Sequence, residues 1–464
     1  MKSEHIPAKV KALAQKVCDA GGQALLVGGC VRDALLGLDA KDWDVEVYGI
    51  EPEKLRELLR GFGRVDVVGE AFTVYKIGQN LDVSLPRRER KTGRGHRGFV
   101  VEGDPQMSFA EACRRRDFTV NAILQDPLNG EIIDPYDGRG DISRKLLRHI
   151  AAETFVEDSL RVLRAAQFAA RFEFAIDPAT VDLCRTIDLT DLPKERIWGE
   201  MEKLLLTVQQ PSIGFIWLQK LGVIDQIFPE LKALEGVPQE NAWHPEGDVD
   251  VHTWLVVDRA RELIDDLPHP KQVTVMLAAL CHDLGKPATT EFLDGRWRSH
   301  AHEEAGVAPT ESLLARLNIH TLDGYDVRGQ VVALVRDHLK PGAFYKIRHE
   351  IGDGAFRRLA RKCELDLLYR VARADSLGRN AAWVPPEKWF DAVAQEWFIA
   401  KARELCVENK PPASLLLGRH LLEMGVRPGP QMGQILQAVY EMQLDGRVTN
   451  LAEAENAARP LLQP

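Results

Sequence analysis

The sequence lacks the features of a membrane or secreted protein. Its 464 residues contain no apolar run close to the roughly 18 residues that cross a bilayer. The charged, amphipathic stretch 1–22 predicts a helix rather than a signal peptide. The seven cysteines are scattered and form no C-x-x-C pair, which is typical of reduced thiols and not of a disulfide framework or a zinc ribbon. We therefore expect a cytoplasmic chain without a membrane partner.

Positive charge is also in the minority, with 60 Lys and Arg against 69 Asp and Glu and a net charge of −9. This balance argues against nucleic-acid binding over the whole surface. It leaves room for local basic tracks, and residues 87–97 (RRERKTGRGHR) form a basic, glycine-containing loop. Internal repeats and low-complexity segments are absent, and the overall composition is that of ordinary globular domains.

The pattern along the chain predicts an α+β protein with several domains. A chain of 464 residues is too long for one core. The first part alternates short strand-like runs with helices and glycine turns, whereas long helical patterns dominate from about residue 155. We therefore expect a small mixed α/β head followed by an all-α body. Clusters of Pro and Gly suggest joints in that body. The predicted domains are a head at 1–150, a helical neck at 151–240, a second helical domain at 241–380 and a helical tail at 381–464.

Two aspartates that follow a glycine turn give the strongest chemical signal in the head. A short apolar run, ALLV, reads as a buried strand, after which Gly28 and Gly29 turn the chain into a predicted helix over 31–36. Free N–H groups at a helix start of this kind bind phosphate. Asp42 and Asp44 stand at i and i+2 of a second predicted strand, so both carboxylates face the same way and can hold the same divalent cations. The pattern predicts metal-assisted phosphoryl chemistry on a nucleotide.

Further charged residues fit this chemistry, and each has an ordinary alternative. Asp82 is either a third carboxylate, acting as a base or a metal ligand, or a common strand-end Asp. Arg32 lies early in the predicted helix, where a guanidinium can reach phosphate oxygens. Three consecutive arginines usually mark a solvated face. Here an apolar segment, FTVNAIL, follows them, so we expect Arg116 to point inward at an anion.

A third motif, EDSLRVLR at 157–164, places Asp158 and Arg161 three residues apart on a predicted helix, with Arg164 on the same face. One interpretation is a plain helix salt bridge. The other is that an Asp acceptor beside an Arg donor pairs with the edge of a cytosine or an adenine. Protein side chains would then replace a template.

Histidines and aspartates form a second constellation in the helical body. Imidazoles and carboxylates from separate helices converge on divalent metals in helical hydrolases. The set consists of His252, His282, Asp283 and Asp375, with His302 and His338 as ligands of a second metal. A nearby histidine, His300, either supports this site or is merely exposed.

Together, the motifs of the first 205 residues resemble the class II tRNA nucleotidyltransferase family, which includes CCA-adding enzymes and bacterial poly(A) polymerases. The matching segments are LVGGCVRDALLG with KDWDVEV, RRRDFTVNAI, DPYDGRGDI and EDSLRVLRAAQFAARF. The resemblance implies a palm-type head with two Mg²⁺ ions. The roles it implies are metal binding by Asp42 and Asp44, NTP contacts by Gly29, Arg32, Arg116 and Arg164, and base selection by Asp158 and Arg161. One position departs from the family: Gln167 stands where bacterial CCA-adding members often carry arginine, which leaves one triphosphate contact open.

The second constellation resembles an HD-type phosphohydrolase domain, a module that some bacterial CCA-adding enzymes carry after the neck. This implies phosphomonoesterase or phosphodiesterase chemistry on nucleotides, with a divalent transition metal of unknown identity. The alternative is a degenerate HD fold kept as an RNA-binding scaffold. By the same resemblance, the segment 414–464 grips the tRNA elbow.

The expected function is therefore template-independent addition of CCA to the 3′ end of tRNA, from CTP and ATP with Mg²⁺, with phosphohydrolase activity in the HD domain. The same motifs are compatible with a poly(A) polymerase or with an enzyme that adds only CC or only A. An alternative of another class is an HD nucleotide phosphohydrolase whose head merely binds nucleotide. The basic loop 87–97 either orders over the primer end or is an ordinary surface loop.

Overall fold

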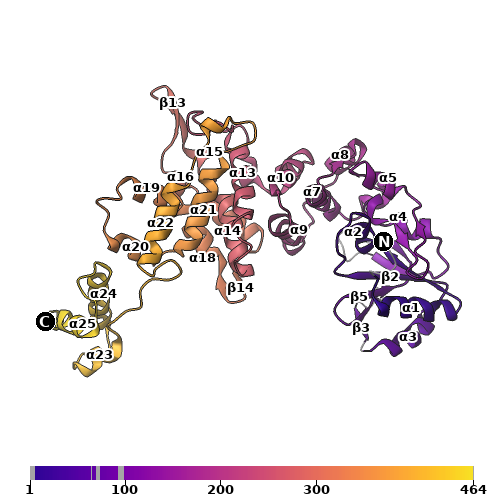
Figure 1. The fold of residues 1–464 in the computed structure, drawn as a ribbon, viewed down its shortest axis with the longest axis horizontal. Helices are drawn as coiled ribbons and strands as arrows, with labels where there is room; N and C mark the ends of the chain where they lie inside the picture. Colours follow the sequence, from indigo (N-terminus) through magenta and orange to yellow (C-terminus); the bar gives the residue numbers. More distant parts are fainter. Residues whose placement is uncertain (1–5, 64, 69–73, 92–98, 463–464) are drawn as a thin grey trace. The chain divides into compact units, whose positions relative to one another are not determined.

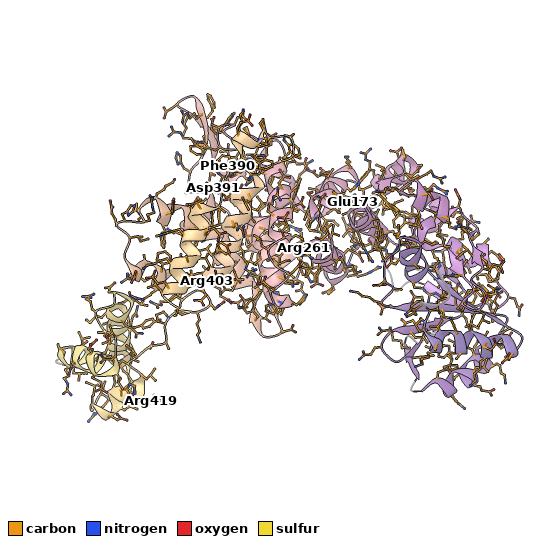
Figure 2. All side chains as sticks on the ribbon, in the orientation of Figure 1. Glu173, Arg261, Phe390, Asp391, Arg403 and Arg419 are labelled. Carbon is orange, nitrogen blue, oxygen red and sulfur yellow. The ribbon has the colours of Figure 1, made fainter. Side chains whose placement is uncertain are left out.

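The computed structural model describes residues 6–63, 65–68, 74–91 and 99–462. The chain forms two compact units, Met1–Leu204 with Ile213–Ile227, and Leu205–Ser212 with Phe228–Pro464. The predicted α+β class is confirmed, because a mixed sheet fills the first unit and helices dominate the second (Figure 1). Figure 2 draws the described side chains, with Arg261 marking the end of helix α13 and Arg419 marking the tail helix α23.

The head is built on a seven-stranded sheet in which β2 and β5 are parallel neighbours and the other pairs are antiparallel. In spatial order the strands are β3 (Val65–Val68), β4 (Val74–Ile77), β5 (Leu81–Ser84), β2 (Trp43–Tyr48), β1 (Gln23–Val27), β8 (Leu124–Gln125) and β9 (Ile132–Ile133). The apolar run of β1 is buried on both faces. Leu26 joins the core beneath α1 (Ala8–Asp19) and α3 (Pro52–Leu59), and Leu25 joins the core beneath α4 (Phe109–Arg114). A continuous apolar strand is expected where helices cover both faces.

The loop predicted over 87–97 is wrong for its first part. Residues Arg87–Lys91 form strand β6, which pairs antiparallel with β7 (Phe99–Gly103). The charged sequence RRERK has little strand propensity, so its pairing with β7, the next strand along the chain, decides its structure. The rest of the predicted loop lies outside the described residues.

Helices carry the neck and the HD-like core. The neck helices are α7 (Leu160–Phe172), α8 (Pro178–Arg185), α9 (Lys194–Thr207), α10 (Pro211–Lys220), α11 (Val223–Ile227) and α12 (Pro229–Lys232). In the second unit, α14 (His269–Cys281) is apolar along most of its length and packs against α13 (Val249–Arg261), α18 (Val327–Asp337) and α21 (Leu365–Gly378). This core brings together helices that are more than 100 residues apart in the sequence.

The helical body also contains two short hairpins that the helical pattern does not indicate. They are β12 (Thr290–Leu293) with β13 (Arg296–Ser299), and β14 (Thr321–Leu322) with β15 (Tyr325–Asp326). Each turns on an Asp-Gly pair with positive φ at both residues, 51° and 77° in the first and 50° and 80° in the second. Asp-Gly is a strong signal for tight hairpin turns, so the sequence did carry a signal for both hairpins.

The tail packs its own small core and is tied to the body by charge. Helices α23 (Gly418–Glu423), α24 (Pro430–Leu444) and α25 (Leu451–Ala458) enclose an apolar cluster. Glu441 on α24 accepts from Arg358 on α20 (Asp353–Leu359) at 3.0 Å and from Arg361 at 2.8 Å. None of the helices in the described part of the chain has the length and apolar character needed to cross a membrane.

Candidate functional site

The parallel pairing of β2 and β5 places two of the predicted carboxylates side by side. Asp44 of β2 stands in register with Asp82 of β5. Asp42 directly precedes β2, so the strand predicted to carry both aspartates begins one residue later, at Trp43. Desolvation raises the pKa of Asp44 above its usual range, Arg116 opposes this shift, and the charges of Asp82 and Asp42 add to it. Carboxylates crowded in this way are the ligands that hard divalent cations prefer.

The glycine turn lies against this carboxylate group. Gly28 has φ 72°, and a Cβ there would stand 3.0 Å from Arg116 Nη1 and 3.9 Å from Asp44 Oδ2. A glycine therefore allows both the turn and the close approach. Helix α2 (Gly29–Leu35) begins directly after it, close to the helix predicted over 31–36. The turn, an arginine and a carboxylate of the predicted set thus meet at one place.

The two arginines before Asp117 point inward and share a buried acid that the sequence did not single out. Glu46 of β2 is fully buried and accepts from Arg115 at 2.9 Å and from the Tyr48 hydroxyl at 2.6 Å. Arg116 Nη2 is 3.9 Å from the same carboxylate. Burial raises the pKa of Glu46, but the charges of Arg116 and Arg115 overcome this, so its pKa lies below the usual range. Glu46 is therefore an anion that holds both guanidinium groups in place.

A chain of polar contacts joins α2, the segment after the arginines and α7. Arg32 donates to Asn121 Oδ1 at 2.6 Å, Asn121 donates to Asp117 Oδ1 at 2.8 Å, and Arg164 donates to Asp117 Oδ2 at 2.7 and 2.9 Å. The ring of Phe168 contacts both guanidinium groups, with the Arg32 group 5.0 Å and the Arg164 group 4.9 Å from its centroid. Burial raises the pKa of Asp117, but the Arg164 charge and the Asn121 hydrogen bond outweigh it and hold the pKa at about 2.

Gln167, which stands where related enzymes often carry arginine, lies inside the core because its side chain is buried on α7. Arg171 stands one helical turn further along and pairs with Asp33 Oδ2 at 3.0 Å. The other oxygen of Asp33 accepts from Arg32 at 2.6 Å. An arginine of α7 therefore does reach the α2 region, from position 171.

The predicted base-reading pair does not form the plain helix salt bridge of the first interpretation. Asp158 precedes α7, whose first residue is Leu160, so the prediction that it lies on this helix is wrong. Asp158 accepts from Arg196 at 3.0 Å on each of its two oxygens, and this bidentate partner was missed. Arg161 donates to the backbone carbonyls of Thr154 and Arg115, both at 2.6 Å. The donor and the acceptor are thus each fixed by a separate partner.

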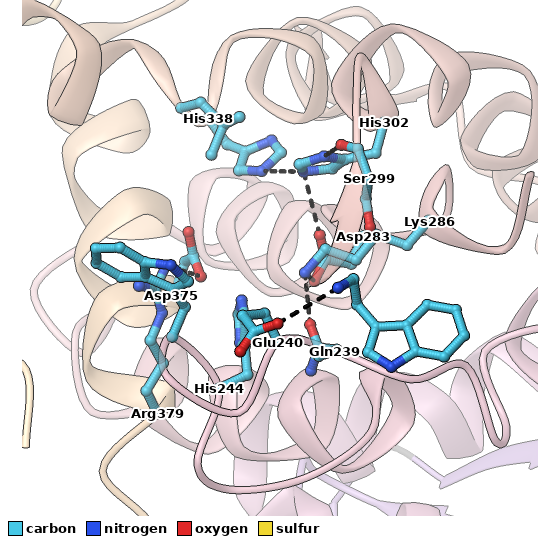
Figure 3. Close-up of a pocket in the computed structure, with 13 residues that line it drawn as sticks. Gln239, Glu240, His244, Asp283, Lys286, Ser299, His302, His338, Asp375 and Arg379 are labelled. Carbon is cyan, nitrogen blue, oxygen red and sulfur yellow. Dashed lines mark hydrogen bonds and ion pairs between the residues drawn. The ribbon is translucent and has the colours of Figure 1, made fainter. Parts of the chain in front are cut away.

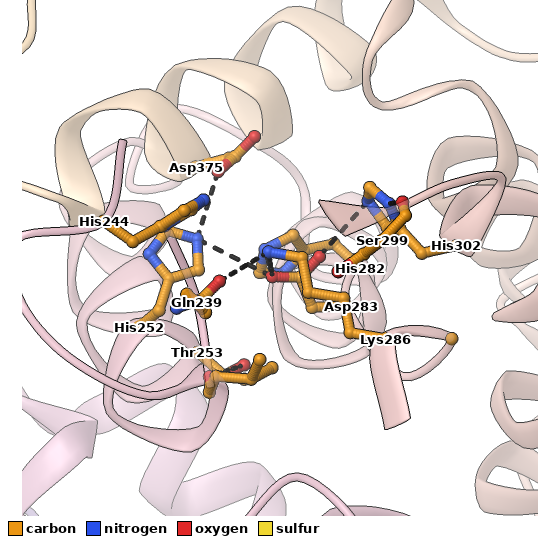
Figure 4. Close-up of polar contacts among 12 residues, drawn as sticks. Gln239, His244, His252, Thr253, His282, Asp283, Lys286, Ser299, His302 and Asp375 are labelled. Carbon is orange, nitrogen blue, oxygen red and sulfur yellow. Dashed lines mark hydrogen bonds and ion pairs between the residues drawn. The ribbon is translucent and has the colours of Figure 1, made fainter. Parts of the chain in front are cut away.

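The second constellation converges in the helical unit (Figure 4). His252 Nε2 is 3.1 Å from Asp375 Oδ1 and 3.8 Å from Asp283 Oδ2, and His282 Nε2 is 3.1 Å from the same Asp283 oxygen. His302 Nε2 lies 3.4 Å from Asp283 Oδ1. All of these residues are buried. They were predicted to lie on helices, but His282 and Asp283 directly follow α14. A helix end leaves these side chains free to turn into the site.

Each histidine ring has a partner near Nδ1. The acceptors are Ala279 O for His282 at 2.8 Å, Ser299 O for His302 at 2.9 Å and Val335 O for His338 at 2.6 Å, and the Glu246 carboxylate lies 2.7 Å from Nδ1 of His252. An acceptor at Nδ1 keeps the proton there and leaves the Nε2 lone pair for a cation. All four Nε2 atoms belong to the close contacts of this site.

The donor atoms fit a divalent metal. Several groups of His, Asp and Glu in this unit have ligand atoms within 4.8 Å of one another, among them Asp283 with His302 and His338. His282 Nε2 and Asp283 Oδ2 are buried 3.1 Å from each other, and Lys286 Nζ is 2.7 Å from the same carboxylate oxygen. A coordinated cation would bind the imidazole nitrogen and the carboxylate oxygen in place of these contacts. Nitrogen and oxygen donors of this kind suit transition metals.

The site opens into a cavity of about 260 Å³ (Figure 3). Lys286 and Arg379 line it and were both missed by the sequence reasoning. Lys286 Nζ is 2.7 Å from Asp283 Oδ2, and Arg379 Nη2 is 3.5 Å from Asp375 Oδ1. Lys286 follows Asp283 by three residues, a spacing that could have predicted their ion pair. His300 is exposed, in agreement with the second of its two interpretations.

Both sites define a class of protein: a nucleotidyltransferase-type head joined to an HD domain. Family models agree. The "Poly A polymerase head domain" matches residues 24–148, the "Probable RNA and SrmB- binding site of polymerase A" matches 173–235, and the "HD domain" matches 249–380.

Curated relatives narrow the class to a family. The chain is 39% identical to the multifunctional CCA protein of Xanthomonas campestris over 83% of this chain and 93% of that protein. It is 38% identical to the multifunctional CCA protein of Actinobacillus pleuropneumoniae over 81% of this chain and 91% of that protein. The chain belongs to the family of the multifunctional CCA proteins.

Solved structures share the fold. The CCA-adding enzyme of Bacillus stearothermophilus in complex with CTP superposes with a TM-score of 0.64 at 20% identity, covering 98% of this chain and 99% of that one. The Thermotoga maritima CCA-adding enzyme complexed with tRNA gives 0.59 at 18% identity, over 99% and 97%. At these identities the likeness concerns the fold.

Proposed function

We propose that this protein adds C, C and A to the 3′ end of tRNA from CTP and ATP, without a nucleic-acid template. The observation that carries the proposal is the meeting of Asp44 and Asp82 in parallel register beside the glycine turn. Family membership supports it, because the relatives matched over most of their length are multifunctional CCA proteins. The crowded carboxylates account for a metal requirement, and the anchored arginines account for triphosphate binding.

In this proposal the head holds the reacting groups in place. Asp42, Asp44 and Asp82 would hold Mg²⁺, and the bound ion would lower the pKa of the RNA 3′-hydroxyl and neutralise charge on the triphosphate. Arg116, held by Glu46 at the glycine turn, binds phosphate oxygens that approach Gly28 and Gly29. Lys76 pairs with Asp82 Oδ2 at 2.8 Å. This ion pair has to release the carboxylate when a cation is bound.

The neck supplies nucleotide selection. Arg32 and Arg164 contact opposite ends of the Asn121–Asp117 pair, so the two cations keep a fixed spacing. Asp158 and Arg161 are the residues that face the base in this proposal. Their fixed partners, Arg196 and two backbone carbonyls, limit how far each can move when cytosine is replaced by adenine.

A tRNA extension assay tests the proposal. Purified protein is incubated with tRNA that lacks its tail and with CTP, ATP or both, and the products are sequenced. We expect CC with CTP alone and CCA with both nucleotides. An Asp44→Asn variant should add nothing while still binding tRNA. A wild-type product that carries only A on any RNA would instead identify a poly(A) polymerase, and a product that stops at CC would identify a partial enzyme.

We infer that the HD domain hydrolyses phosphate esters of nucleotides with a divalent transition metal. His252, His282, Asp283 and Asp375 are the ligands in this proposal. The ligand atoms of His252, His282 and Asp283 lie within 4.8 Å of one another, which supports it. His302 and His338 would hold a second ion. A His282→Ala variant should lose hydrolysis and keep nucleotide addition. Loss of addition together with a harmless Asp42→Ala would favour the rival proposal, a phosphohydrolase whose head merely binds nucleotide.

We also propose domain limits near residues 150, 240 and 380 and a location in the cytoplasm. The tail core around α24 is the proposed support for the tRNA elbow.

A further inference from the structure

Two exposed tryptophans line the cavity that contains the HD ligands. Trp243 has 57% and Trp297 has 37% of its surface exposed, and both border the cavity of about 260 Å³ together with Asp283 and His302. They come from separate segments, the stretch before α13 and strand β13. Large apolar surface next to a polar, charged cavity marks a binding site.

The hairpin that carries Trp297 is braced in this position. The backbone N–H of Trp297 donates to Glu240 Oε2 at 3.3 Å, which ties β13 to the segment that contains Trp243. The Phe292 ring packs edge-on against the Trp297 ring with centroids 5.1 Å apart. The Trp297 ring is therefore packed against Phe292 of β12, and the backbone that carries it is tied to the segment of Trp243, although the ring faces solvent.

The lining of the cavity combines charged groups with apolar surface. In Figure 3, Lys286 lies beside Asp283 and Arg379 beside Asp375, so a phosphate group would find a cation near each of these carboxylates. The tryptophans add flat aromatic surface, with Leu339 as a further exposed apolar side chain on the same cavity. A nucleotide has this pairing of parts, a charged phosphate joined to a flat base, and bases stack well on tryptophan.

We propose that Trp243 and Trp297 form a base-stacking platform that makes the HD site selective for nucleoside phosphates over phosphate esters that carry no base. The proposal rests on the phosphohydrolase function proposed above. It assigns specificity to the two rings and leaves hydrolysis to the ligand cluster. Stacking on an aromatic side chain contributes roughly five- to hundredfold to the binding of a base.

The test compares two kinds of substrate. The metal-loaded full-length protein is assayed with the 2′-, 3′- and 5′-monophosphates of adenosine and with ribose 5-phosphate, which lacks the base. Trp243→Ala and Trp297→Ala should each raise the KM for an adenosine monophosphate roughly tenfold, leave kcat near wild type and leave ribose 5-phosphate unaffected. Replacement by Phe should restore most of the affinity. Trp389→Ala is the matched control, because this residue is 51% exposed and does not line the cavity.

The outcomes separate the two proposals. Equal losses on both substrates, or no change on either, would overturn the platform while hydrolysis stands. If the wild type hydrolyses neither substrate, the phosphohydrolase proposal fails, and the platform is then judged by equilibrium binding of adenosine monophosphate to the same variants. A tenfold weaker binding in the Trp→Ala variants that is absent in Trp389→Ala supports the platform. Unchanged binding contradicts it.

Discussion

Replacing Asp117 with Asn tests whether the contacts between α2 and α7 depend on one buried charge. The carboxylate is 7% exposed and receives hydrogen bonds from Arg164, from Asn121 and from the backbone N–H of Phe118. The amide of Asn has the shape of the carboxylate and can form part of its hydrogen bonds, but it carries no charge. Among the described residues, no other carboxylate lies within hydrogen-bond distance of Arg164, since that of Glu200 is 4.0 Å away.

The pKa of Asp117 gives the magnitude. A carboxyl group that titrates at about 2 in the folded protein and at 3.8 otherwise stabilises the fold by the difference of 1.8 pKa units, or about 2.4 kcal/mol at neutral pH. We expect Asp117→Asn to lower the free energy of unfolding of the head by about 2–3 kcal/mol. Because the folded pKa is lowered, this contribution is complete above pH 4 and is lost as the pH falls toward 2. The gap between wild type and variant should therefore be constant from pH 7 to 5 and smaller at pH 3.

Hydrogen exchange of the β1 and β2 amides measures this free energy in the head alone, which matters because a chain of several units need not unfold in one step. Asp137→Asn is the control: its partner is also an arginine, Arg144 at 2.9 Å, but the Asp137 side chain is 64% exposed. The control should leave exchange unchanged, since water and salt already screen that pair. An equal effect of the two substitutions, or a loss at position 117 below about 0.5 kcal/mol, would refute the reasoning.

Three further outcomes follow from the geometry. Gly28→Ala should abolish nucleotide addition, because the new methyl group meets the Arg116 guanidinium at 3.0 Å; Gly78→Ala has the same φ of 72° but nothing within 4 Å, so it should cost stability without abolishing addition. Asp82→Asn should reduce the rate of addition at low Mg²⁺ more than at high Mg²⁺, as measured by primer extension, and an equal loss at both concentrations would exclude a role in metal binding. Saturating divalent transition metal, at 100 times its dissociation constant, should stabilise the wild-type HD domain by about 2.7 kcal/mol in thermal unfolding, and His282→Ala should show no such shift.

Local patterns predicted the parts of the site but not how they are joined. The glycine turn, the helix after it and the strand with Asp44 follow from short-range spacing, and the structure contains all three. The partnership of Asp44 with Asp82 depends on a parallel pairing between strands 38 residues apart, whose register no local pattern sets. The same holds for Arg196, which reaches Asp158 from helix α9.

In the HD cluster, too, the sequence indicated the residues but not their contacts. The histidines and Asp375 stood out by residue type, because few other residues bind transition metals. The position of His282 just past the end of α14 and the contacts of the cations Lys286 and Arg379 come from tertiary packing. The two Asp-Gly hairpins are a different case: the signal was present in the sequence, and long helical patterns around it hid the turns.

The product of the tRNA extension assay tests the central claim most directly. With tailless tRNA, CTP and ATP, the account predicts a single added sequence, CCA, and the loss of all addition in Asp44→Asn. A run of A residues on unrelated RNA, or full addition by Asp44→Asn, would contradict it.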